Sequence, residues 1–240
     1  MKKLPYILLT LLVTQVLAPP LPAGSEGYHP PVAETFPDLL MPVNLRHLNI
    51  RNPSVTAIVR IGTDGEILDH VVISASHAQL IGPAERALKF ARFQPAHDET
   101  GTLVADLNLE VHFRDPGREI AGTIAMSVTD HIDENIQGLA HTQPAMQMSL
   151  PDELDKPLSV SGDGEILVPV DADDQPVKGR AVIELYVDAQ GIPRLPKILV
   201  SDHPAITKAA LHRIEGLRFE PPTRNGLPTV VKARLPFNFD

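Results

Sequence analysis

Three carboxylates stand close together at Asp171, Asp173 and Asp174, where they could hold a hard cation. Calcium takes several oxygen ligands, and alternating carboxylates are how a calcium loop supplies them. The run lacks the glycine at position six and the glutamate at position twelve of such a loop. A solvated turn is therefore the preferred interpretation.

A second group has softer ligands. His141, Met146 and Met148 lie close together in the sequence and could suit copper in an exported protein. The competing interpretation is an exposed linker with adaptable methionines, and the loose spacing favours it.

Two histidines and two arginines occupy matching places further along the chain. His77 and His203 could be paired ligands or catalytic groups, but neither has a neighbouring Cys, a nucleophilic Ser motif or a His-Glu-x-x-His partner. We expect each to help form the start of a helix. Arg92 and Arg218 could bind the carboxylate of a partner or cover a phenylalanine edge with their stems, and both readings stay open. No catalytic, metal-binding or cofactor-binding residue is assigned.

The places match because the chain contains one small module twice. Identical residues recur at a constant offset of 126 positions across about fifty residues, a self-similarity that chance seldom gives. The pairs are Gly65/Gly191, His77/His203, Ala84/Ala210, Arg92/Arg218, Phe93/Phe219, Pro95/Pro221, Val104/Val230, Leu109/Leu235 and Phe113/Phe239. The function must therefore be sought in the module.

Each unit begins with the pattern of a strand hairpin. Apolar residues alternate over 57–61 and again over 183–187, and a turn with Gly65 or Gly191 follows before the next apolar run. Glycine suits a tight turn because it accepts a positive φ.

A helix and a closing strand should follow the hairpin. Ser76 and Asp202 are residue types that cap helix starts, and apolar residues then recur at helical spacing. Pro83 predicts that the first helix begins late or is kinked. After an Arg-Phe-x-Pro motif, alternation returns over 107–113 and 233–239. The expected order in each unit is strand, strand, helix, strand.

The start of the chain has the layout of a secretory signal peptide, with Lys2 and Lys3 ahead of an apolar stretch over residues 4–18. Cleavage is expected near Ala23. An uncleaved anchor stays open because Pro19 and Pro20 spoil the nearest small-residue site, and membrane contact is expected only in that case.

Composition limits the partners. With no cysteine, an exported chain has no disulfide and no lipid on an N-terminal cysteine, so stability must come from packing. The net charge of −9 argues against nucleic acid or anionic lipid as a partner.

The segment between the units has its own pattern. Apolar residues every fourth position predict a short helix over 124–139, residues 144–157 are interpreted as a loop, and 164–170 as an extra strand that could pair with the second unit.

The succession of motifs resembles the C-terminal domain of TonB-family proteins. The second unit carries Val187-Asp188 before the turn, Phe219-Glu220-Pro221-Pro222, Gly226 and Pro236-Phe237-Asn238-Phe239. The first unit is similar through Asp64-Gly65, Phe93-Gln94-Pro95-Ala96, Gly101 and Phe113. Together the two units cover about half of the chain.

The resemblance implies an α+β fold made of two such modules, each a three-stranded antiparallel sheet with one packed helix. It also implies a non-enzymatic, cofactor-free periplasmic protein that binds a segment of an envelope protein or outer-membrane transporter by adding a strand to a sheet edge. The expected partner-binding residues are Val231, Ala233, Leu235, Phe237, Phe239 and Arg218. Dimerisation by strand exchange stays open.

The expected organisation has five parts: the leader at 1–23, an N-terminal segment at 24–54, the first domain at 55–114, a linker with a short helix at 115–160, and the second domain at 161–240. The leader has no histidine and residues 19–53 have no stiff Glu-Pro or Lys-Pro spacer, which puts force transmission from a proton-driven motor in doubt. The alternative is an exported enzyme or metal-handling protein with a site between the units.

Overall fold

The structure, a computed structural model, describes residues 27–48, 50, 52–116, 146–162 and 167–239. The leader over 1–23, the helix expected over 124–139 and His141 lie outside the described residues. In the ranges that are described, no helix is long and apolar enough to cross a membrane.

In the first half, the middle strand β2 (Ser54–Ile61) pairs antiparallel with β3 (Ile67–Ala75) and β7 (Ala105–His112). Every second residue of β2 is buried, as the alternation predicted. A single 3-10 turn, η2 (Ala78–Leu80), precedes α1 (Ile81–Leu88), which packs on β3. The α-helix begins late in this half, as the proline at position 83 predicted.

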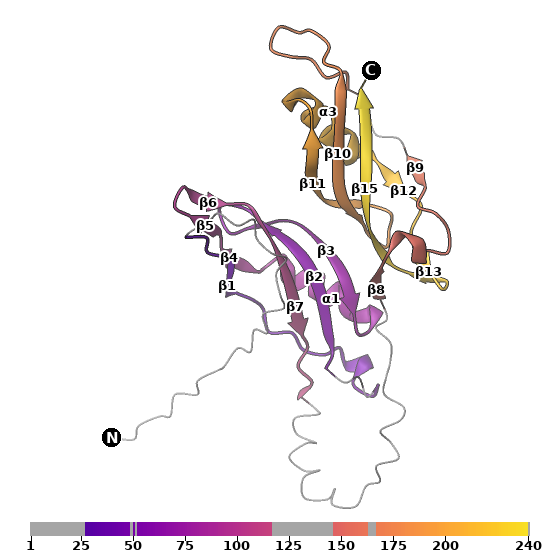
Figure 1. The fold of residues 1–240 in the computed structure, drawn as a ribbon. Helices are drawn as coiled ribbons and strands as arrows, with labels where there is room; N and C mark the ends of the chain where they lie inside the picture. The colour runs from indigo at the N-terminus through magenta and orange to yellow at the C-terminus, as the bar shows by residue number, and fades with distance from the viewer. Residues whose placement is uncertain (1–26, 49, 51, 117–145, 163–166, 240) are drawn as a thin grey trace, which may run out of the picture.

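The second half has the same succession. Its middle strand β10 (Gly179–Val187) pairs antiparallel with β11 (Pro193–Ser201) and β15 (Val230–Phe239). The helix α3 (Pro204–Gly216) covers one face of this sheet, where the odd-numbered residues of β10 are buried. The opposite face carries no helix among the described residues (Figure 1).

The remaining short elements are β1 (Val32–Thr35), η1 (Val43–Leu45), β4 (Arg92–Gln94), β5 (Ala96–Asp98), β6 (Gly101–Leu103), β8 (Met146–Ser149), η5 (Pro151–Glu153), β9 (Val160–Gly162), β12 (Arg218–Phe219), β13 (Thr223–Arg224) and β14 (Leu227–Pro228). The mixed α+β class expected from the sequence is confirmed.

The halves are not separate sheets. The strand β8 pairs antiparallel with the end of β3 and parallel with the start of β15, which gives one seven-stranded sheet in the order β11-β10-β15-β8-β3-β2-β7 (Figure 1). The expectation of a loop over 144–157 was therefore wrong. Met146 packs into the core of the first half, and the Ser149 hydroxyl lies 2.8 Å from that of Thr229, with both residues buried.

The extra strand expected over 164–170 was also misplaced. The strand of this region is β9, which ends at Gly162 and pairs with β12. Residues 163–166 lie outside the described part of the chain, and Val170 forms an isolated bridge with Pro176.

A second contact joins the halves at the start of β11. Leu195 is 2% exposed and lies in the core of the first half, although it belongs to the second. Its N–H donates to the Asp69 carboxylate at 2.8 Å, and Arg60 donates to the Pro196 carbonyl at 2.8 Å. Leu195 has a positive φ of 52°, an uncommon conformation for a leucine. The junction therefore holds this residue in a strained backbone geometry.

Candidate partner-binding edge

The outer edge of β15 is paired only at its beginning. The strand β8 lies beside Val230 and Val231 and goes no further. From the Lys232 carbonyl to Phe239, no described residue pairs with the backbone of β15 on the side away from β10. This stretch runs to the end of the described chain (Figure 1). It is called the open edge below.

The direction of the backbone groups on the open edge follows from Arg180. The Arg180 carbonyl accepts from the N–H of Asp202 at 3.0 Å, and its own N–H donates to the Asp202 carboxylate at 2.9 Å. Both backbone groups of Arg180 thus face away from β15, which makes Arg180 and the opposite residue Asn238 a non-hydrogen-bonded pair. The outward-facing groups therefore belong to every second residue: Lys232, Arg234, Pro236 and Asn238. Of these, Pro236 has no N–H to offer, and the Lys232 N–H faces β8, where the parallel register of Val231 with Ser149 places it against the Ser149 carbonyl.

The side chains expected to bind a partner point the other way. Val231 and Phe237 are buried, and both lie in the core of the second half with Ile183, Leu185 and Ile214. Ala233, Leu235 and Phe239 are partly buried against the same core. These residues hold β15 on its own domain, so an added strand would contact the backbone of β15 rather than these side chains.

Arg218 lies in β12, at the end of α3. Its guanidinium donates to the carbonyls of Glu215 at 3.0 Å and Leu217 at 2.6 Å. Cations near a helix C-terminus are favourable because the last carbonyls lack partners. The matching Arg92 donates to the Ala91 carbonyl at 2.9 Å and pairs with Glu66 at 3.5 Å. The structure gives both arginines roles within this chain.

The two matching histidines begin the helices, as expected. The Nδ1 of His77 accepts from the N–H of Gln79 at 3.2 Å, and the Nδ1 of His203 accepts from the N–H of Ala205 at 3.1 Å. The two histidines are therefore the N-caps.

The expectation that Ser76 and Asp202 are the caps was wrong. Ser76 instead accepts from the backbone N–H of Ser54 at 3.0 Å, just as Asp202 does from Arg180. Each side chain ties the end of one hairpin strand to the start of the other.

The exposed face of the open edge is charged. Glu184 on β10 pairs with Lys232 at 2.7 Å and with Arg234 at 3.0 Å. Burial alone would raise the pKa of Glu184, but the hydrogen bonds from these two cations outweigh it and keep that pKa below its usual value. The carboxylate is therefore ionised at neutral pH and shared between two cations.

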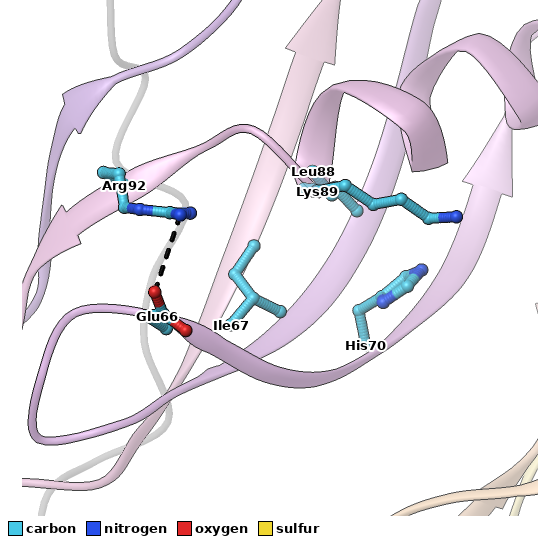
Figure 2. A pocket seen from close by; sticks show the side chains of 6 residues that line it. All are labelled: Glu66, Ile67, His70, Leu88, Lys89 and Arg92. Atoms are coloured by element: carbon cyan, nitrogen blue, oxygen red, sulfur yellow. Dashed lines mark ion pairs between the residues drawn. The ribbon is translucent and has the colours of Figure 1, made fainter.

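A shallow pocket of about 250 Å³ lies in the first half, beside the end of α1. Figure 2 shows Lys89 reaching over His70 on one side and the Arg92–Glu66 pair on the other, with Ile67 and Leu88 between them. No counterpart of this charge pattern is expected in the second half, where Ile192, Pro196 and Glu215 replace Glu66, His70 and Lys89 at the same offset.

His70 should make stability depend on pH. Burial lowers its pKa below the ordinary 6.5, so the folded protein favours the neutral ring. Above pH 6.5 the ring is neutral in both states. As pH falls through 6.5, the unfolded chain gains a proton that the folded chain resists, so the free energy of unfolding falls until the folded pKa is passed.

We expect His70→Gln to remove this contribution. Urea unfolding from pH 7.5 to 5.5 should show the wild-type chain losing more stability than the variant. If the free energies of unfolding of the two proteins change in parallel across this pH range, the fold does not suppress protonation of His70.

The other candidate chemistries find no support in the described residues. There, no three His, Cys, Asp or Glu side chains lie close enough to hold a metal ion. Asp171 accepts from the N–H groups of Asp173 and Gln175, both at 2.9 Å, which makes the run an exposed turn. Met146 is buried in β8 rather than exposed in a linker.

Some protein-interaction domains bind an extended peptide by adding it as a strand to an exposed sheet edge, and the second half has such an edge among its described strands. Residues 168–240 match the family model described as Gram-negative bacterial TonB protein C-terminal. That family is a non-enzymatic protein-interaction domain, it contacts outer-membrane transporters, and its proteins are periplasmic or associated with the cell envelope. The match covers the second half of the fold. No curated protein and no solved structure matches the chain.

Proposed function

We propose that this chain is a periplasmic, non-enzymatic TonB-like protein that binds an extended segment of an envelope protein at the open edge of β15. The observation that carries the proposal is the backbone from the Lys232 carbonyl to Phe239, whose outward side pairs with no described strand, within a segment that matches the TonB C-terminal family. An extended peptide can pair with the outward-facing groups and continue the sheet. A segment of an outer-membrane transporter is the partner class that the family suggests.

We further propose that residues 55–114 are a second copy of the same domain, beside 161–240. Equivalent residues make equivalent contacts in the two halves. The N–H of Phe93 donates to the Gly65 carbonyl at 3.1 Å, and that of Phe219 donates to the Gly191 carbonyl at 2.9 Å. The histidine caps repeat as well. The strand of the first half that corresponds to β15 is β7, which pairs only with β2 among the described strands.

The direction of the backbone groups decides which proline would test the open edge. Ala233 and Leu235 face β10, opposite Leu185 and Ile183, so proline there would break the internal ladder and unfold the domain. Arg234 faces outward, and its strand already tolerates Pro236 two residues later. Arg234→Pro should therefore remove one outward donor and leave the fold intact.

The test uses uncharged eight-residue peptides of alternating Val and Thr, screened by fluorescence anisotropy on the full chain. We expect a bound peptide to slow amide hydrogen exchange at Arg234 and Asn238, whose outward N–H groups pair with no described strand. Arg234→Pro should weaken binding about tenfold or more, since a lost backbone bond leaves the facing carbonyl unpaired. Arg234→Ala is the matched control because it keeps the N–H. Equal binding by a folded Arg234→Pro variant would refute strand addition at β15.

A further inference from the structure

The sheet face of the second half opposite α3 carries an excess of positive charge, and Tyr186 on this face packs against the core of the first half. The strand register places the side chains of this face in rows across three strands: Lys232, Tyr186 and Arg194 in one, and Arg234, Glu184 and Lys197 in the next. Arg180 lies further along, opposite Asn238. Five cations therefore share a face on which these strands supply one carboxylate, Glu184. This set is called the basic face below.

Not all of these charges are compensated. Arg194 pairs with Asp188 at 3.0 Å and lies 3.5 Å from Asp69, so it is neutralised locally. Lys232 and Arg234 share the single carboxylate of Glu184. An ammonium has three donors and a guanidinium five, so each cation can bind a carboxylate of an added strand and keep its bond to Glu184. The basic face is thus able to accept negative charge without leaving a half-buried carboxylate unpaired.

The basic face contrasts with the charge of the whole chain, which is −9. Neighbouring strands lie about 4.8 Å apart, whereas salt screens charges over roughly 8 Å under physiological conditions. A strand added to the open edge therefore experiences Lys232 and Arg234 directly, and experiences charges more than about one screening length away only weakly.

The equivalent edge in the first half has the opposite charge. The positions that correspond to Lys232 and Pro236 in the repeat are Asp106 and Glu110 on β7, and both are exposed. Asp106 is partly neutralised by Arg60 at 2.7 Å, while Glu110 lies 3.7 Å from the ring of His112. An acidic segment would thus meet cations at β15 and carboxylates at β7.

We propose that the strand accepted by the open edge is acidic, with Asp or Glu at two alternate positions opposite Lys232 and Arg234. This inference rests on the proposed function and adds the chemistry of the partner. Side chains directly opposite each other on neighbouring strands interact, and each pair of opposite charge raises affinity roughly 1.5- to 5-fold. Alternate spacing is required because successive side chains of a strand point to opposite faces. Charge therefore directs an acidic partner segment to the edge of β15 rather than to the edge of β7.

Three eight-residue peptides test the inference on the full chain. They share an alternating Val and Thr background and carry Asp, Asn or Lys at the same two alternate positions. We expect the Asp peptide to bind about fivefold or more tightly than the Asn peptide at 50 mM NaCl, and the Lys peptide to bind most weakly. The advantage of Asp over Asn should shrink at 300 mM NaCl. It should vanish in the double variant Lys232→Gln with Arg234→Gln, while the Asn peptide binds both proteins alike.

The outcomes separate the inference from the proposed function. Equal binding of the Asp and Asn peptides, with slowed amide exchange at the open edge, would overturn the acidic preference and leave strand addition standing. No binding by any peptide would overturn both. Vesicles of phosphatidylglycerol and the oligomeric state give two further readouts. If the double variant loses vesicle binding, or loses self-association of the chain, while the Asp peptide shows no preference, the occupant is a lipid surface or the acidic β7 of a second copy, and the inference is wrong.

Discussion

Gly191→Ala is expected to lower the free energy of unfolding by about 3 kcal/mol or more, the combined effect of a left-handed backbone and a steric overlap. Gly191 has a φ of 78°, which side-chain-bearing residues adopt at a cost. A Cβ at this position would also overlap the carbonyl oxygen of Phe219. That carbonyl cannot easily retreat, because the N–H of the same residue is bonded to Gly191 at 2.9 Å.

Gly226→Ala is the matched control for this prediction. Its φ of 74° is nearly the same, yet nothing lies within 4 Å of the added Cβ. We expect it to cost only about 1 to 2 kcal/mol, the backbone part alone. Thermal unfolding should therefore show Gly191→Ala melting roughly 3 to 8 °C below Gly226→Ala. Equal losses would mean that the turn relaxes and that the contact with Phe219 does not constrain it.

Leu195→Ala is expected to lower the free energy of unfolding by about 2 to 5 kcal/mol, the usual range for emptying a buried leucine site. Leu195 comes from β11 but is buried in the core of the first half, with Val59 and Ile61 among the residues of that core. A positive φ is about as unfavourable for alanine as for leucine. The loss of stability in this variant therefore measures the lost packing rather than backbone strain. The two halves should become less coupled as a result.

Leu199→Ala on the same strand serves as the comparison, because Leu199 is 39% exposed. It should cost about 0.5 kcal/mol or less, as surface substitutions usually do. Urea unfolding of the two variants measures the difference. If Leu195→Ala is as mild as Leu199→Ala, the junction between the halves contributes little, and the halves fold as independent units.

Repeated residues in the sequence correspond to repeated contacts in the structure. Gly65 and Gly191 recur because each lies against the backbone of a phenylalanine, Phe93 or Phe219, where any side chain would collide. A constraint of this kind acts on residue type directly, so it is visible as identity at a fixed offset. The family resemblance of the second half is supported by the family-model match over residues 168–240.

Helix caps show where residue type misleads. Ser and Asp are common N-cap residue types, whereas His is not. N-cap preference alone therefore predicted Ser76 and Asp202, which are not the caps. The structure uses the two preceding side chains to tie strands together and leaves the caps to His77 and His203. The recurrence of both histidines at the repeat offset was the available signal.

Hydrophobic periodicity and turn residues predicted the main succession of strand, strand, helix and strand in each half, because these signals act over a few positions. That β8 and Leu195 join the halves depends on contacts between distant segments, since a four-residue strand is defined by its neighbours rather than by its own pattern. The same holds for the open edge. Which backbone groups of β15 remain unpaired depends on hydrogen bonds to β10, some fifty residues earlier in the chain, and no local pattern encodes them.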